Sequence, residues 1–264
     1  MSILDKIKIT QAGAPRVTIY GKPGIGKSTL ASQFPDPLFL LTEDNELPGI
    51  KSLGIFSDYA ELWSSVEELL KLQTLPFQTL VIDSVTKLDS LVTKYTIEKS
   101  PTVGRERRPA ETLAEAWGSY GAGYEKAASL HKALKYQLDK FKERGVSVIY
   151  IAHIETKKYK SPEHEDYDIL TITMNGDKSR AVYIDDVDAV LFCKVKSRLV
   201  EADENSGRQI IKSTDQRIIV ADVSEAHVSK NRYNLPKDIE MSFIELQKHM
   251  PFYNKSSPIT KGVF

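Results

Sequence analysis

The chain has little of several features that mark extracellular or membrane proteins. Its 264 residues include one cysteine, Cys193, so no intrachain disulfide can form, and we expect a reducing compartment. No apolar run approaches the ~18 residues that a membrane-spanning helix needs. The first residues also lack the apolar stretch of a signal peptide. We therefore expect a cytoplasmic protein that does not act at a membrane.

The sequence has no excess of charge of either sign. Lys and Arg total 36, and Asp and Glu total 36, so any binding of a polyanion must come from local basic patches. Hydrophobic residues make up 41% and charged residues 27%, which is ordinary for a globular protein. Cys193 follows Val190-Leu191-Phe192, which favours a buried strand position over a reactive thiol.

One stretch near the N-terminus matches a nucleotide-binding motif. Residues 21–29, GKPGIGKST, fit the phosphate-loop pattern G-x-x-x-x-G-K-[ST] at every fixed position. Its glycines permit a tight loop whose backbone N–H groups point inward and bind an anion. A buried strand at 16–20 should precede the loop and a helix should begin near Lys27, which is the context the motif requires. The predicted nucleotide-binding residues are Gly21, Pro23, Gly24, Ile25, Gly26, Lys27, Ser28 and Thr29.

The motif gives its side chains separate tasks. Lys27 should reach the β- and γ-phosphates of ATP, and the Ser28 hydroxyl should ligate Mg²⁺. Residues 79–84, TLVIDS, form an apolar run that ends in an aspartate, which is the Walker B pattern. It predicts that Asp83 lies near the magnesium ion, usually through a water molecule.

Apolar runs alternate with helical patterns as far as His153. Strands are expected at 16–20, 38–42, 79–84 and 146–153, and helices at 58–73, 86–98 and about 124–144. This alternation predicts an α/β fold with a mainly parallel sheet covered by helices on both faces. Further strands at 169–173, 188–195 and 217–223 should add C-terminal strands or a hairpin. We expect one domain over residues 1–240 and a partly flexible tail over 241–264.

Hydrolysis of ATP needs a group that orients or deprotonates the attacking water. Many motor ATPases have a glutamate directly after the Walker B aspartate, but here that residue is Ser84. Glu43 follows the 38–42 strand, and ligands of open α/β sheets bind at the carboxyl ends of the strands. Glu43 is therefore the best candidate, with Asp44 and Glu46 as alternatives.

Together these features resemble the RecA superfamily. The segment 81–85, VIDSV, is similar to the RecA Walker B strand, and 42–44, TED, lies where that family keeps its catalytic glutamate. His153 ends the strand at the family's γ-phosphate sensor position, although RecA itself has glutamine there. The resemblance implies a RecA-like P-loop NTPase core in which His153 senses the γ-phosphate.

A late motif extends this resemblance. Residues 229–236, SKNRYNLP, resemble the K-N-R-F-G motif of the RadA/Sms branch, with Tyr for Phe and Asn for Gly. The resemblance implies that Lys230 and Arg232 act on the nucleotide of a neighbouring subunit, so the protein would form a homo-oligomer, either a ring or a filament.

Among such proteins the chain is most similar to small RecA-like ATPases of bacteriophages, over most of residues 12–240. The segments that carry this similarity are 117–124, 151–153, the acidic loop 163–168 and 187–192. The resemblance implies a role in DNA recombination or single-strand annealing. It also suggests single-stranded DNA and a single-strand-binding protein as partners.

Two basic clusters are candidates for contacts with DNA. The first follows His153, where the family keeps its first DNA loop, and the second lies in the 99–112 loop. Lysine and arginine side chains would contact phosphates, and a tyrosine would stack on a base. The candidates are Lys157, Lys158, Tyr159, Lys160, Arg105, Arg107 and Arg108. Nearby acidic residues make a solvated polar hairpin an equal interpretation of 155–168.

Two other functions remain open at this point. A small-molecule or nucleoside kinase would use the same phosphate loop, with the arginines of 105–108 as a lid. A scaffold protein could bind ATP as a switch without turnover.

Overall fold

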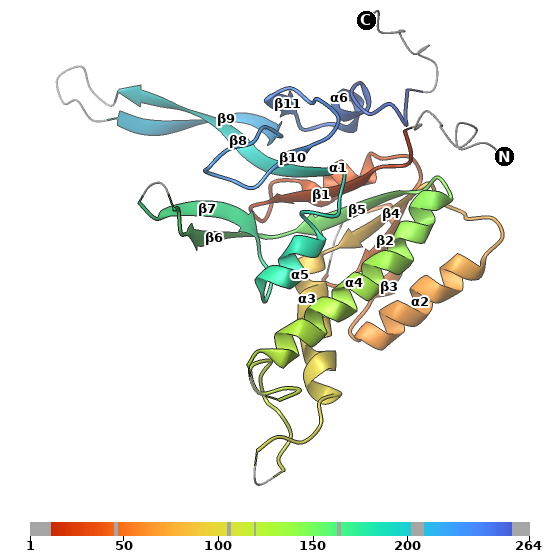
Figure 1. The fold of residues 1–264 in the computed structure, drawn as a ribbon. Coiled ribbons are helices and arrows are strands. Elements are labelled where there is room, and N and C mark those ends of the chain that lie inside the picture. Colours follow the sequence, from red (N-terminus) through yellow and green to blue (C-terminus); the bar gives the residue numbers. More distant parts are fainter. Residues whose placement is uncertain are drawn as a thin grey trace, which may run out of the picture.

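A nine-stranded sheet lies at the centre of the fold in the part of the chain that the structure describes (Figure 1). The computed structural model describes residues 12–44, 47–104, 107–118, 120–162, 165–201 and 209–254, and their side chains except those of 198–201 and 209–213. The strands of this sheet are β1 (Arg16–Gly21), β2 (Pro37–Leu41), β3 (Lys51–Ile55), β4 (Thr79–Asp83), β5 (Ser147–Ala152), β8 (Ala189–Glu201), β9 (Gln209–Val220), β10 (Lys230–Asn231) and β11 (Asp238–Glu240).

The strand order is β11-β9-β8-β1-β5-β4-β2-β3, with β10 paired to β8. The six strands from β8 to β3 in this order pair in parallel, whereas β9, β10 and β11 pair antiparallel. The strand that leads into the phosphate loop, β1, is separated from the Walker B strand, β4, by β5. This arrangement confirms the expected α/β fold with a mainly parallel sheet. The antiparallel strands come from the C-terminal part of the chain, as expected.

Helices cover both faces of the sheet (Figure 1). On one face α2 (Tyr59–Lys71), α3 (Val85–Glu98), α4 (Ala122–Glu143) and α5 (Asp177–Val182) pack on a large apolar core. On the other face α1 (Lys27–Ser32) and α6 (Phe243–Gln247) pack on a second core. Strands β1, β4 and β5 lie between these two layers, which explains why their sequences are almost continuously apolar.

Short polar signals set where the helices begin. The Asp58 carboxylate accepts hydrogen bonds from the backbone N–H groups of Ala60 and Glu61, which caps α2. The Ser84 hydroxyl accepts from the N–H of Lys87 and caps α3. Both side chains satisfy N–H groups that have no partner inside the helix. Because Ser84 directly follows Asp83, strand β4 ends and α3 begins at the Walker B aspartate.

Two hairpins project from the edge of the sheet at which the parallel strands end (Figure 1). The first is a separate antiparallel pair, β6 (Ile154–Tyr159) and β7 (Tyr167–Ile172). The second is the continuation of β8 and β9 beyond Cys193, the residue that pairs with Gly21 at the end of β1. Both hairpins therefore flank the start of the phosphate loop.

Some elements were not expected from the sequence. Strand β3 lies exposed at the edge of the sheet, so it lacks the apolar pattern that marks the buried strands. Part of the expected tail packs on the core, with Phe243, Leu246 and Met250 buried. Residues 255–264 lie outside the described part. The expected domain boundary at residue 240 stays a prediction. None of the helices in the described part of the chain has the combination of length and apolar character that a membrane span needs.

Candidate active site

The phosphate loop lies between β1 and α1. Gly24 and Gly26 have φ angles of +74° and +100°, a left-handed conformation that residues with a Cβ adopt only with strain. Lys27 begins α1, and its Nζ donates to the carbonyl oxygens of Gly21 at 3.1 Å and Lys22 at 3.2 Å. Burial lowers the pKa of Lys27, although nearby acidic groups favour its charged form. The loop and its lysine thus have the form that the motif predicts.

Ser28 and Asp83 come together at the ends of two different elements. The Ser28 Oγ donates to Oδ2 of Asp83 at 2.6 Å, so α1 and β4 meet here. A hydroxyl and a carboxylate are oxygen ligands of the kind that Mg²⁺ prefers, and Mg²⁺ commonly takes its other ligands from nucleotide phosphates and water. Groups of three or more His, Cys, Asp or Glu residues that could hold a metal by themselves are absent from the described residues. The pair therefore fits a magnesium ion bound together with a nucleotide.

Glu43 lies beside this pair, at the end of β2. Thr42 fixes its place, because the Thr42 Oγ1 donates to the Ser84 carbonyl oxygen at 2.7 Å and accepts from the Ser84 N–H at 2.9 Å. These two hydrogen bonds join the ends of β2 and β4. The Nε2 of His153 lies 2.9 Å from Oε1 of Glu43. Two residues singled out separately in the sequence are thus in direct contact.

The environment of Glu43 keeps its carboxyl group ionised. Partial burial acts against ionisation, but hydrogen bonds from His153 and Ser84 and the positive charge of Lys87 outweigh it and lower the pKa of Glu43 below 4.5. Of the two alternatives, Asp44 is exposed to solvent and Glu46 lies outside the described residues. The geometry favours Glu43 as the group that meets the nucleotide.

The family model of an AAA domain matches residues 14–233. The chain belongs to this AAA domain family. It is an AAA-type P-loop ATPase with a RecA-like fold, and this family membership implies binding of a nucleotide and of Mg²⁺.

Other comparisons add less about this AAA domain. No curated protein matches the chain. Among solved structures, a KaiC-like protein from the hyperthermophilic archaeon Pyrococcus horikoshii OT3 is similar, with 13% sequence identity, 79% of each chain covered and a TM-score of 0.37. At this TM-score the similarity carries no weight in the assignment, which rests on the family match and on the strand order.

Lys230 and Arg232 lie away from the phosphate loop of their own chain. Lys230 pairs with Val190 near the start of β8, whereas the loop begins where Gly21 pairs with Cys193 at the other end of the parallel segment. From Val190 to Cys193 the strand rises roughly 10 Å. The two basic residues therefore lie at the opposite edge of the sheet from their own nucleotide site. A role at a neighbouring subunit's site stays a prediction.

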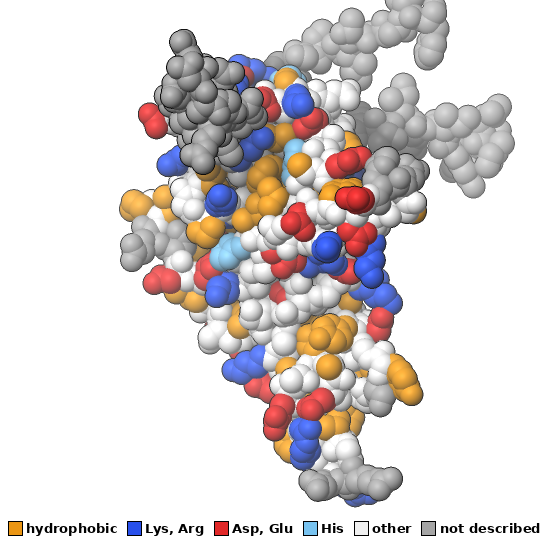
Figure 2. Space-filling model, turned by 90° about the vertical axis from the view of Figure 1, so that its left-hand side faces the viewer, with side chains coloured by type: hydrophobic (Ala, Val, Ile, Leu, Met, Phe, Trp, Pro, Cys, Tyr) orange, Lys and Arg blue, Asp and Glu red, His pale blue; other side chains and the backbone are white. Residues whose placement is uncertain are grey.

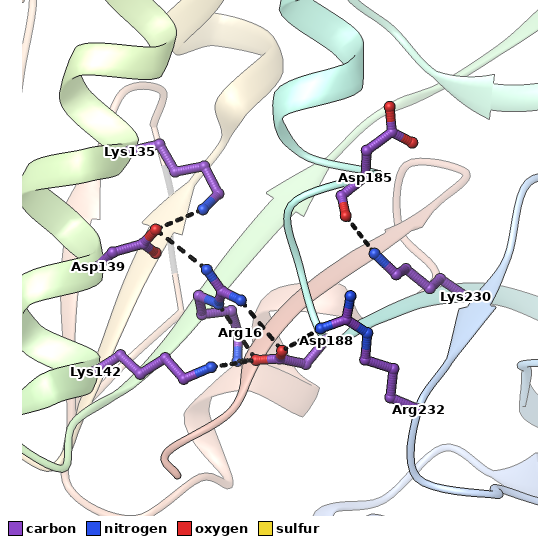
Figure 3. Close-up of polar contacts among 8 residues, drawn as sticks. All are labelled: Arg16, Lys135, Asp139, Lys142, Asp185, Asp188, Lys230 and Arg232. Atoms are coloured by element: carbon purple, nitrogen blue, oxygen red, sulfur yellow. Dashed lines mark hydrogen bonds and ion pairs between the residues drawn. The ribbon is translucent and has the colours of Figure 1, made fainter. Parts of the chain in front are cut away.

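An ion-pair cluster that the sequence did not suggest holds Arg232 in place (Figure 3). Asp188 lies at its centre and accepts from Nη1 of Arg232 at 3.3 Å, from Nζ of Lys142 at 3.0 Å and from the Arg16 guanidinium at 3.2 Å. The Nζ of Lys230 donates to the Asp185 carbonyl oxygen. Burial acts against ionisation of Asp188, but the hydrogen bonds from Arg16 and Lys142 and the charge of Arg16 outweigh it and lower its pKa to about 2.

The first basic cluster lies on the β6–β7 hairpin. Lys158, Tyr159 and Lys160 are exposed, and neither lysine forms an ion pair with another described residue. Lys157 instead pairs with Asp177. The Tyr159 ring lies 5.2 Å from that of Tyr167 between centroids, directly across the hairpin. The hairpin thus presents an aromatic pair and two available cations.

The second basic cluster is elsewhere. Arg107 and Arg108 lie in the loop between α3 and α4, at the bottom of Figure 1 and away from the hairpins. Arg108 forms an ion pair with Glu115 at 2.7 Å, and Arg105 lies outside the described residues. Figure 2 views the molecule from the side to which the hairpins point, and there basic side chains are mixed with acidic ones. The structure does not bring the two clusters together.

Proposed function

We propose that this AAA domain hydrolyses ATP with magnesium, couples the hydrolysis to binding of single-stranded DNA, and works as a homo-oligomer. The contact between Glu43 and His153 carries the proposal, because it connects the candidate base to the segment that leads to the β6–β7 hairpin.

The residues at the carboxyl edge of the sheet divide the work of hydrolysis. The loop N–H groups and Lys27 bind the phosphates, and Ser28 and Asp83 hold the magnesium ion. Magnesium, when bound, neutralises charge on the phosphates. Glu43, which is ionised, accepts a proton from the attacking water. Its place beside Asp83 and its lowered pKa both support this role. His153 holds the Glu43 carboxylate in one orientation and responds to the γ-phosphate.

In this proposal the segment that follows His153 couples DNA binding to ATP hydrolysis. Residue 154 begins β6, and the exposed Lys158, Tyr159 and Lys160 lie on or directly after that strand. The backbone N–H of His153 donates to Thr86 Oγ1 at 3.0 Å and its carbonyl oxygen accepts from Thr173 N–H at 3.0 Å. The base of the hairpin is thus fixed to the nucleotide site, and a shift of His153 would move the hairpin. In this proposal the lysines contact DNA phosphates and Tyr159 stacks on a base.

The biological role follows from the resemblance to bacteriophage RecA-like ATPases. It supports recombination or single-strand annealing, with a single-strand-binding protein as a further partner. Oligomerisation is supported by Lys230 and Arg232, which lie at the opposite edge of the sheet from their own nucleotide site and would complete the site of the next subunit.

The test is steady-state ATP hydrolysis with and without single-stranded DNA. We expect DNA to stimulate turnover, and Lys27→Ala to abolish turnover under both conditions. Lys158→Ala combined with Lys160→Ala should remove the stimulation and keep the basal rate. The matched control is Lys71→Ala combined with Lys94→Ala, two exposed lysines on α2 and α3, which should keep the stimulation.

The other results would contradict the proposal in different ways. Turnover that depends on Lys27 and is indifferent to DNA would overturn the DNA coupling. A requirement for a nucleoside acceptor would indicate a kinase. ATP binding without any turnover would indicate a switched scaffold.

A further inference from the structure

Arg217 lies beside the phosphate loop and is not part of the site formed by Lys27, Ser28 and Asp83. A Cβ placed on Gly26 would lie 2.9 Å from Nη1 of Arg217 and 3.9 Å from Cε of Met241. Gly26 is the glycine that precedes Lys27 in the motif. The Arg217 guanidinium is therefore in contact range of the loop that binds the phosphates.

The strand pairing places Arg217 on the correct side of the sheet. Arg217 lies on β9, directly opposite Val195 of β8. Ile219, two residues further along the same strand, lies in the core with Leu30 of α1. Because side chains two residues apart point to the same face of a strand, Arg217 projects over the face that carries α1 and the loop. The extension of β8 and β9 beyond Cys193 thus lies next to the phosphate loop.

The Arg217 side chain is available to a ligand. It is exposed, and it makes no hydrogen bond or ion pair with any other residue that the structure describes. Its backbone, in contrast, is fixed, because the Arg217 carbonyl oxygen accepts from the N–H of Met241 at 3.2 Å. A charged side chain on a fixed strand, next to a loop built for anions, has a clear candidate ligand.

We propose that Arg217 binds the α- and β-phosphates of the nucleotide held by its own chain. The inference rests on the proposed nucleotide site. The phosphate loop cradles the α- and β-phosphates, so a guanidinium beside Gly26 meets that part of the nucleotide. The planar guanidinium donates two parallel hydrogen bonds to a phosphate, which an ammonium group cannot do. Arg217 acts in cis, unlike the proposed role of Lys230 and Arg232.

The experiment measures binding of Mg-ADP and Mg-ATP by isothermal titration calorimetry in the absence of DNA. Arg217→Ala should weaken the binding of both nucleotides by about 10- to 100-fold, which is the loss of affinity expected for one charge-assisted contact. Because ADP and ATP both have the α- and β-phosphates, the affinity for the two nucleotides should fall by the same factor. Arg217→Lys should recover only part of the affinity, because the charge returns without the paired donors.

A matched variant controls for loss of charge on the same hairpin. Lys196 is an exposed cation of the β8–β9 extension, and Lys196→Ala should bind both nucleotides as the wild type does. Thermal melting of each variant checks that it folds. Because Arg217 is exposed and has no side-chain partner among the described residues, Arg217→Ala should leave the melting temperature unchanged.

Each other result has a definite meaning. Unchanged ADP affinity in Arg217→Ala, with binding lost in Lys27→Ala, overturns the inference. So does a loss confined to ATP, which would be the sign of a contact with the γ-phosphate alone. Weaker binding of single-stranded DNA with normal nucleotide affinity would also overturn it and assign Arg217 to a DNA surface. If Arg217→Ala loses both nucleotides but DNA fails to stimulate the wild type, the inference stands and only the proposed DNA coupling fails.

Discussion

The Nε2 of His153 lies 2.9 Å from Oε1 of Glu43, although the two residues are 110 positions apart in the chain. Glu43 follows β2 and His153 follows β5, and β4 with Asp83 lies between these two strands. The contact places a candidate base, a candidate sensor and the Walker B aspartate side by side. It also gives a physical route from the nucleotide to the β6–β7 hairpin.

Replacing Glu43 with glutamine should separate binding from hydrolysis. The amide keeps the shape of the side chain but cannot accept a proton, so turnover should fall by about 10²- to 10⁴-fold with ATP affinity nearly unchanged. Single-turnover hydrolysis and nucleotide binding measure the two effects. The control is Asp44→Asn, an exposed neighbour, which should keep normal turnover. A slow Asp44→Asn and a fast Glu43→Gln would move the base to Asp44.

The lowered pKa of Glu43 also predicts the pH dependence of turnover. Because this pKa lies below 4.5, the carboxylate stays ionised throughout the neutral range, and its protonation should not reduce kcat above about pH 5. A kcat profile for the wild type, recorded where the protein stays folded, tests this. A fall of kcat near neutral pH that disappears in Glu43→Gln would show that the pKa of Glu43 is instead raised.

Asp188 should stabilise the fold in a pH-dependent way. Partial burial acts against its ionisation, but Arg16 and Lys142 lower its pKa from 3.8 to about 2. A lowered pKa means that the stabilisation is present above the ordinary aspartate pKa and is lost as the pH falls from about 4 to about 2, and its size is about 2 kcal/mol.

Urea unfolding of Asp188→Asn tests this expectation. The free energy of unfolding of the variant should be lower than that of the wild type by at least about 2 kcal/mol at neutral pH. This difference should become smaller near pH 3. Asp186→Asn is the control, because Asp186 is exposed, and it should change little. A pH-independent loss in Asp188→Asn would attribute the effect to packing rather than to charge.

Subunit mixing should reveal whether Arg232 acts on a neighbour. Lys27→Ala disables a subunit's own site, and Arg232→Ala would disable the site of the next subunit. Each variant alone should be inactive, whereas a mixture should regain part of the activity, because some interfaces pair an intact loop with an intact arginine. The measurement is ATP turnover against mixing ratio. A mixture that stays inactive although the variants co-assemble would contradict a trans role.

The described part of the C-terminal segment should contribute to the core. Leu246 is fully buried against α1 and the sheet, and Ile244 on the same helix is 63% exposed. Leu246→Ala should lower the free energy of unfolding by about 2–5 kcal/mol, and Ile244→Ala should change it by less than about 0.5 kcal/mol. Denaturant unfolding compares the two. Equal, small effects would mean that this helix is only loosely held.

Much of the site could be predicted because its parts are local. The phosphate loop requires glycines at fixed positions, and the Walker B strand is a short apolar run that ends in a carboxylate. The sequence therefore predicted Lys27, Ser28 and Asp83 together, and Ser28 and Asp83 are in contact at 2.6 Å. Glu43 and His153 were found by their places at strand ends, but nothing in the sequence showed that they touch.

Arg217 shows what local reasoning missed. It ends a run of polar residues, KSTDQR, that has no motif, and its place beside Gly26 depends on how β9 pairs with β8. The Asp188 cluster was missed for the same reason, since Arg16, Lys142 and Arg232 come from three distant segments. Strand β3 was missed because an exposed edge strand does not need the apolar residues that mark buried strands.

The sequence by itself determined the phosphate loop, the Walker B strand and the alternation of strands and helices, since each depends on residues close together in the chain. Only the tertiary structure decided which strand ends meet. The parallel sheet gathers Glu43, Asp83 and His153 at one edge and holds Lys230 and Arg232 at the other. That separation follows from strand order and register, because all parallel strands end at the same edge, whereas the antiparallel β10 brings its basic residues back to the opposite one.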